Sequence, residues 1–208
     1  MKFFLKSKHW QLFIVVVGIP LIMQIIAFAI IISRMFSLAL SHDKPDPLAM
    51  LGLMYTVVPV IMLVCLIIFF LWFYSLGLNL HRKLPSSVNM NLNLFLVFIT
   101  YPVVYMAAFC FFIWRAIQIT DTMLNVGFPT PILLIIPLHL FAMFCMFYCL
   151  YFVSKALKSV ELKREALLGD YIVDFILFWF YFVGIWFLQP RINKVFAEDD
   201  AQLLPQDV

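Results

Sequence analysis

The chain has 208 residues, of which 65% are hydrophobic, 18% aromatic and only 12% charged. The charged fraction is about half that of an average soluble protein, and a water-soluble domain needs charged side chains over its surface. The composition therefore excludes a soluble globular protein and indicates an integral membrane protein. The net charge of +3, without a recognition module, does not indicate nucleic-acid binding.

The longest segments without Asp, Glu, Lys or Arg predict the membrane spans. The first four are 25, 35, 31 and 33 residues long, and the fifth has 16. A bilayer core about 30 Å thick needs roughly 20 helical residues, and lipid offers the backbone no hydrogen-bond partner. We therefore predict an all-α membrane protein with four transmembrane helices. In chain order the five segments are 9–33, 47–81, 84–114, 122–154 and 175–190.

Two helix starts are indicated directly by the sequence. The pairs Asp46-Pro47 and Thr130-Pro131 each place a capping side chain before a proline at the first helical position. The second and fourth helices should therefore begin there. For the third helix, the sequence offers capping side chains at Ser86, Ser87 and Asn89.

The fourth helix should continue beyond the bilayer as a charged extension. Gly169 is the expected C-terminal cap of this helix, and Asp170 should cap the next one. Asp174 follows one turn later, and the pair resembles carboxylates suited to acid/base work. Acids at a helix start also cap free N–H groups, and we favour that structural role.

Basic residues predict the orientation. Nine lie at the amino terminus and in the second-to-third and fourth-to-fifth connections, against three on the other side, so these parts should be cytoplasmic. The nine are Lys2, Lys6, Lys8, Arg82, Lys83, Lys155, Lys158, Lys163 and Arg164, and the three are Arg34, Lys44 and Arg115.

The fifth segment is too short for a secure span. Its apolar part, 175–188, would be about 21 Å long as a helix. If the segment stays on the cytoplasmic side, Arg191 and Lys194 bring the basic residues to 11 on that side against 3 on the other. If it spans, the numbers are 9 against 5. We favour a shallow or re-entrant C-terminal helix, with five spans as the alternative. Residues 197–208 form an acidic tail beyond the single membrane domain, 1–196.

Two features suggest internal organisation. A shift of 82 residues superposes Pro20 on Pro102 among other identities, so segments 11–81 and 93–154 are possible tandem helical hairpins. Each span also carries an internal proline, which removes a backbone hydrogen bond and should bend the helix. The four are Pro20, Pro59, Pro102 and Pro137.

Few polar side chains lie inside the spans. Gln24, Thr100 and His139 are expected to face the bundle interior and to bond across helices. Met143 and Met146 share a helical face with His139, which makes the three a candidate soft-metal site. A buried, hydrogen-bonded histidine is the simpler interpretation, so we predict no metal and no cofactor.

The remaining candidates lie near the span ends or carry sulfur. Arg34 and Arg115 occupy similar positions at the outer ends of the first and third helices. They either extend to the headgroups or frame an outer mouth. The four cysteines lie in apolar segments and are expected to act as small hydrophobic residues.

Two short segments carry a resemblance to known proteins. KHWQLF at 8–13 and WFYFVGIWFLQPRIN at 179–193 resemble small uncharacterised polytopic membrane proteins of bacteria. The resemblance covers about 20 residues and implies a location in the cell inner membrane, but no activity.

Two functions fit this sequence. The first is a non-enzymatic accessory protein or subunit that packs against a membrane-protein partner or another copy. The second is a small oligomeric channel or transporter lined by the kinked helices. The sequence has no nucleophile elbow, phosphate loop or HExxH helix, so we expect no catalytic residues.

Overall fold

The computed structural model describes residues 2–40, 47–118 and 131–202, and these ranges are helical with short connections. Four helices are long and apolar enough to cross a membrane, which confirms the predicted spans: His9–Ser37, Val57–Arg82, Leu92–Arg115 and Ile135–Leu162. The helices in chain order are α1 Lys2–Lys6, α2 His9–Phe13, the π-helix η1 Ile14–Gly18, α3 Ile19–Leu40, α4 Pro47–Arg82, α5 Leu92–Gln118, α7 Pro131–Leu162, α8 Leu168–Trp179 and α9 Tyr181–Gln202.

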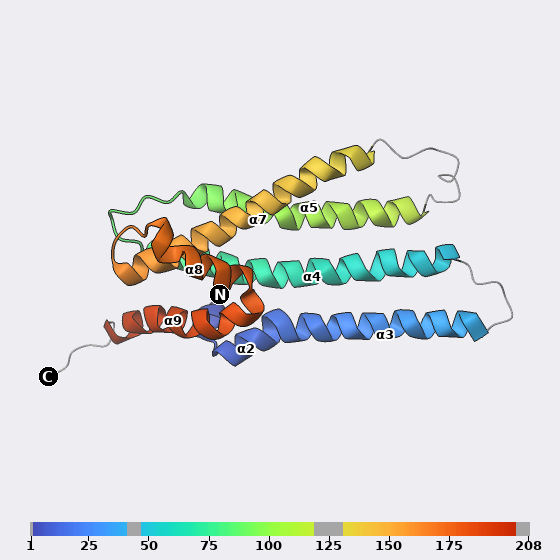
Figure 1. The fold of residues 1–208 in the computed structure, drawn as a ribbon, viewed down its shortest axis with the longest axis horizontal. Coiled ribbons are helices and arrows are strands. Elements are labelled where there is room, and N and C mark those ends of the chain that lie inside the picture. Colours follow the sequence, from blue (N-terminus) through green and yellow to red (C-terminus); the bar gives the residue numbers. More distant parts are fainter. Residues whose placement is uncertain (1, 41–46, 119–130, 203–208) are drawn as a thin grey trace.

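The long helices run antiparallel, with α3, α4 and α5 in succession and α7 beside α5 (Figure 1). The N-terminus, the α4–α5 connection, the end of α7 and helices α8 and α9 gather at one end. We call this the basic end, because most of the lysines and arginines lie there. The other end of the long helices is the outer end.

The predicted helix boundaries are partly right. Helices α4 and α7 begin at Pro47 and Pro131 as expected; the capping residues Asp46 and Thr130 lie outside the described residues. Helix α5 begins later than predicted, at Leu92, and its cap is Asn91, whose Oδ1 accepts the Leu94 N–H at 3.0 Å.

The predicted end of the fourth helix is wrong. Helix α7 ends at Leu162, and Lys163 takes the left-handed conformation with φ of 54°. Gly169 instead lies inside α8. A buried hydrogen bond stabilises the turn between α7 and α8: Ser159 Oγ accepts the Ala166 N–H at 3.1 Å.

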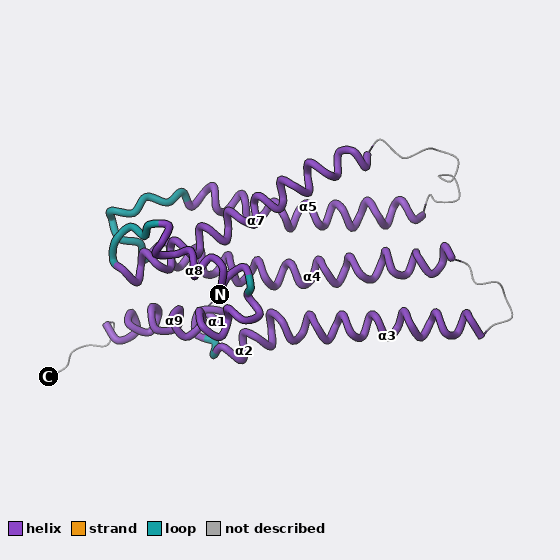
Figure 2. The backbone as a smooth tube through the Cα atoms, viewed as in Figure 1, coloured by secondary structure: helices purple, strands orange, loops and turns teal. Residues whose placement is uncertain are grey.

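The four internal prolines act differently from one another. Pro20 follows the π-helix η1, in which the Ile19 N–H bonds five residues back to the Ile14 carbonyl. Because Pro20 has no N–H and its ring needs room, a widened turn fits directly before it. Pro59, Pro102 and Pro137 lie inside α4, α5 and α7, which remain continuous α-helices (Figure 2).

The C-terminal segment is a helical hairpin, not the single helix that its apolar run suggested. Phe180, with φ of −90° and ψ of 53°, interrupts it, and its carbonyl accepts the N–H groups of Val183 and Gly184. Neither arm is among the four helices of the described residues that are long and apolar enough to span a membrane. We call Leu168 to Pro190 the hairpin. Helix α9 continues to Gln202, so the first part of the predicted acidic tail is helical; 203–208 lie outside the described residues.

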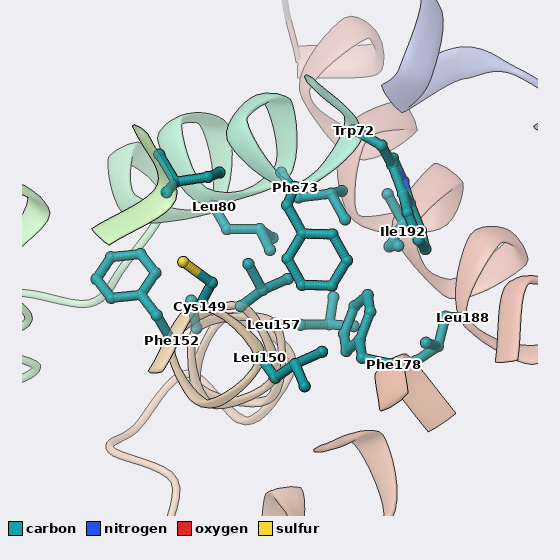
Figure 3. Packing of buried hydrophobic residues seen from close by; sticks show 14 of the residues in the cluster. Trp72, Phe73, Leu80, Cys149, Leu150, Phe152, Leu157, Phe178, Leu188 and Ile192 are labelled. Atoms are coloured by element: carbon teal, nitrogen blue, oxygen red, sulfur yellow. The ribbon is translucent and has the colours of Figure 1, made fainter. Parts of the chain in front are cut away.

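The large buried side chains concentrate at the basic end. Trp72 and Phe73 of α4, Phe152 of α7 and Phe178 of α8 are fully buried and pack together with residues of α9 (Figure 3). Gly77 permits the close contact between α4 and α5, since a Cβ there would overlap the Phe95 ring. Towards the outer end, most described side chains of the spans are exposed.

Candidate functional site

The two segments that carry the sequence resemblance meet at the basic end. The Trp186 ring of α9 lies 4.8 Å from the His9 ring and 5.6 Å from the Phe13 ring, measured between centroids. Helix α2 packs along α9 (Figure 1). Residues nearly 180 positions apart therefore form one surface, which we call the terminal junction.

Gln189 connects the two ends of the chain within this junction. Its side chain is fully buried, and its Nε2 donates to the carbonyls of Phe4 at 2.9 Å and Ser7 at 3.2 Å. The same amide donates to Asn193 Oδ1 at 3.0 Å, and Asn193 Nδ2 donates to the Ser7 carbonyl at 3.0 Å. These bonds satisfy carbonyls at the end of α1 that no further helical turn would reach.

Arg191, two residues later, joins α9 to α7 and α8. Its guanidinium donates to both carboxylate oxygens of Glu161 at 2.8 and 2.6 Å, and to both of Asp174 at 2.5 and 2.9 Å. The Asp174 side chain is only 3% exposed. Hydrogen bonds first to Asp174 and then to Glu161 raise the pKa of Arg191 above its ordinary value. One guanidinium thus pairs with two carboxylates, and Lys158, 3.5 Å from Glu161, balances the remaining negative charge.

Other cations of the basic end are also engaged. Lys158 lies 3.5 Å from Glu161, and Lys155 lies 2.9 Å from Glu165. Lys83 Nζ donates to the Val195 carbonyl at 2.6 Å. Much of the positive charge that predicts the orientation is therefore paired within the chain.

Asp170 and Asp174 do not form the carboxylate pair that their spacing suggested. Asp170 lies in the first turn of α8, not before it as predicted, but its side chain does help to cap the helix: it accepts the N–H of the N-cap Leu167 at 3.0 Å and pairs with Arg164 at 3.0 Å. The Leu167 hydrogen bond, with help from Arg164, holds the pKa of Asp170 below its ordinary value. Asp174 faces Arg191 instead. The two acids therefore have separate structural partners.

The three polar residues predicted for the interior do not form one site. His139 and Thr100 are exposed on the chain, and Gln24 is half-buried. Thr100 Oγ1 bonds to the Leu96 carbonyl of its own helix at 2.8 Å. It also lines an apolar groove of about 190 Å³ between α4 and α5. The expected hydrogen bonding of Thr100 across helices is therefore not what the structure shows.

The soft-metal candidates lie in different environments. His139 and Met143 are exposed, whereas Met146 packs against the core. The His139 ring lies 5.8 Å from the Tyr105 ring. Across the described ranges, no three His, Cys, Asp or Glu side chains are grouped so that they could hold a metal ion.

The residues proposed for an outer mouth are on separate helices. Arg34 of α3 and Arg115 of α5 are both exposed, and α4 lies between the two helices. The neighbouring acids Asp43, Asp46 and Asp121 lie outside the described residues. All four cysteines are free, with Cys145 and Cys149 buried in the core.

No match to this chain is found among models of known protein families, curated proteins or solved structures. The site must therefore be interpreted from its own geometry.

The main polar residues that join the helices at the basic end were not predicted from the sequence. Arg191 entered the prediction only as a basic residue that follows the fifth apolar segment, and Gln189 and Glu161 were given no role. One pattern could have identified Gln189 and Arg191: they directly follow the most aromatic part of the C-terminal segment, and polar residues there need internal partners. Chemically, the arrangement binds helices together, and its charged groups are already paired.

Proposed function

We propose that this protein is a non-enzymatic accessory protein or subunit of a bacterial inner membrane, with the basic end in the cytoplasm. It would act by packing its spans against a membrane-protein partner or another copy of itself. The coarser conclusion, a multi-pass membrane protein, follows from the four apolar helices.

The observation that carries this proposal is the position of His139. It lies within the span Ile135–Leu162 on the outside of the chain. Within the described part of the chain, the imidazole contacts the Tyr105 ring but has no hydrogen-bond partner. Leaving an imidazole N–H without a partner in lipid costs about 2 kcal/mol. A helix of another protein that accepts this hydrogen bond would remove the cost.

The packing of the spans supports the same proposal. Among the described residues, α4, α5 and α7 pack against one another, whereas α3 makes its main span contacts with α4 alone, so much of the α3 surface is left without a partner in the chain (Figure 1). Large apolar side chains near His139 are also exposed, including Leu140 at 60% and Phe144 at 55%. A channel or transporter would need several copies to surround a path.

The arrangement of charges supports a role without catalysis. The acids that could act as a general acid or base are engaged with Arg191, Arg164 and the Leu167 N–H. Groups paired in this way are suited to holding helices together.

The experiment is photo-crosslinking in native membranes. A benzophenone amino acid at Leu140 should give a discrete adduct of higher mass. His139→Leu should weaken the association about fivefold, which corresponds to loss of an interhelical hydrogen bond worth about 1 kcal/mol. Met143→Leu, on the same exposed surface, is the matched control and should leave the adduct unchanged.

Two results together would contradict the proposal of a protein partner. If His139 faces lipid, Leu140 will crosslink only to lipid, and His139→Leu will raise the thermal stability. That pair of results would disprove the proposal. Solute flux from liposomes of the purified protein, abolished by His139→Leu, would replace it with the channel alternative.

A further inference from the structure

The most exposed side chains of the hairpin are apolar. Between Leu168 and Pro190, every side chain classed as exposed is apolar or a glycine. Val173 is 63% exposed and Phe187 is 60% exposed. The exposed residues are Leu168, Gly169, Ile172, Val173, Ile176, Trp179, Phe180, Phe182, Val183, Trp186, Phe187 and Pro190.

Two polar side chains of the hairpin are buried, whereas Asp170, at its start, is partly exposed and pairs with Arg164. Asp174 and Gln189 are buried, at 2% and 0% exposure. Asp174 bonds to Arg191, and Gln189 bonds to carbonyls near the N-terminus. A hairpin lying in water would expose these groups and bury its aromatic residues. This one has the reverse arrangement, which suits a hydrocarbon environment.

The contacts of the hairpin place its tip beside the membrane spans. The Trp179 ring lies 4.4 Å from Phe147 of α7, and the Tyr181 ring lies 5.1 Å from Phe69 of α4. Phe147 precedes Lys155 by eight residues, so the tip lies about 12 Å further into the bilayer than Lys155. This depth remains within one leaflet of a hydrocarbon core about 30 Å thick.

The span surface continues into the hairpin surface at this level. Phe144 of α7, 55% exposed, lies less than one turn from Phe147, and Ile14, 48% exposed, follows Phe13 beside Trp186. The exposed span residues beside the hairpin are apolar, so the hairpin surface suits the same hydrocarbon environment. The exposed Trp186, which lies further from the tip, also suits the boundary region of a bilayer.

We propose that the hairpin is a re-entrant membrane-binding element whose partner is the lipid leaflet at the basic end. Its apolar surface contacts the acyl chains, with Leu168 near the headgroups and Val183 deeper. Because Arg164, Lys158 and Arg191 are paired with acids of the same chain, insertion does not require anionic headgroups. This inference is independent of the proposed protein partner.

The experiment uses the purified full chain with its four native cysteines replaced by alanine. Single cysteines at Leu168, Val183 and the polar control position Arg164 carry an environment-sensitive NBD dye. The proteins are reconstituted in phosphatidylcholine vesicles, with or without phosphatidylglycerol. Each labelled protein must keep the unfolding midpoint of the unlabelled one.

We expect blue-shifted emission at Leu168 and Val183, with quenching by nitroxide lipids. A nitroxide deep on the acyl chain should quench Val183 more than Leu168, and aqueous iodide should quench only Arg164. Both lipid compositions should give the same result. The proposal would be overturned by iodide quenching at Val183 or by a requirement for phosphatidylglycerol. It would also be overturned by blue-shifted emission without nitroxide quenching, because that result would indicate that the hairpin contacts protein and not lipid.

Discussion

Arg191 shows how one side chain can hold several helices. Its guanidinium contacts Glu161 of α7 and Asp174 of α8 from a position on α9. If Arg191 were lost, Glu161 and Asp174 would lie close together without a guanidinium between them. That state would be unfavourable, because the negative charge of the nearly buried Asp174 would be left without its partner. Its planar fork also matches two carboxylates better than a lysine ammonium would.

Arg191→Ala should lower the free energy of unfolding by about 3 kcal/mol, because it leaves the nearly buried Asp174 unpaired. Denaturation of the purified protein in mild detergent measures this effect. The matched control is Arg164→Ala, which removes an exposed pair and should cost much less than Arg191→Ala. Equal losses for the two variants would show that Arg191 does not have the role assigned to it.

At the scale of elements, the hairpin depends on one close backbone contact. A Cβ at Gly184 would overlap the carbonyl of Leu177 in the preceding helix. Only glycine lets α9 start so close to the end of α8. The close contact then sets the direction in which α9 carries Gln189 and Arg191 back towards the N-terminal segment.

Gly184→Ala should therefore destabilise the protein by about 2 kcal/mol, as expected for overpacking against rigid backbone. Its control is Gly169→Ala, where an added Cβ meets no atom within 4 Å. That substitution, inside α8, should be neutral or should stabilise by up to about 1 kcal/mol. Thermal unfolding followed by circular dichroism compares the two, and a neutral Gly184→Ala would contradict the assigned packing.

Element boundaries show which features local sequence can predict. The starts of α4 and α7 followed from Pro47 and Pro131, because proline at the first helical position is a local preference. The end of α7 did not, because Lys163 adopts a left-handed conformation that a lysine rarely takes. Surrounding contacts, including the Ser159 bond to Ala166, stabilise that turn.

The whole molecule is asymmetric from end to end. The basic end combines the terminal junction, the hairpin and most of the core, whereas the outer end has few buried side chains. Stability should therefore reside mainly at the basic end. The exposed outer halves of the spans are free to contact lipid or another protein.

The asymmetry of charge predicts a defined topology. A cysteine at Ser86 should react with a membrane-impermeant maleimide only after the cytoplasmic side is opened, whereas cysteines at Ser41 or Asn125 should react in intact cells. The physical reason is the 11-to-3 distribution of basic residues. Labelling of Ser41 and Ser86 from the same side would contradict both the orientation and the four-span arrangement.

The sequence by itself determined that the chain lies in a membrane, how many spans it has and where two helices start. These features depend on the length of apolar runs and on the local preference of proline for the first helical position. It also supplied the charge distribution on which the orientation rests. Only the tertiary structure decided which side chains meet. His139 lies outside, Gln189 lies inside, and the last apolar run folds back at Phe180. In a chain this apolar, lipid-facing and core-facing helix surfaces have the same composition, so periodicity cannot distinguish them and packing must decide.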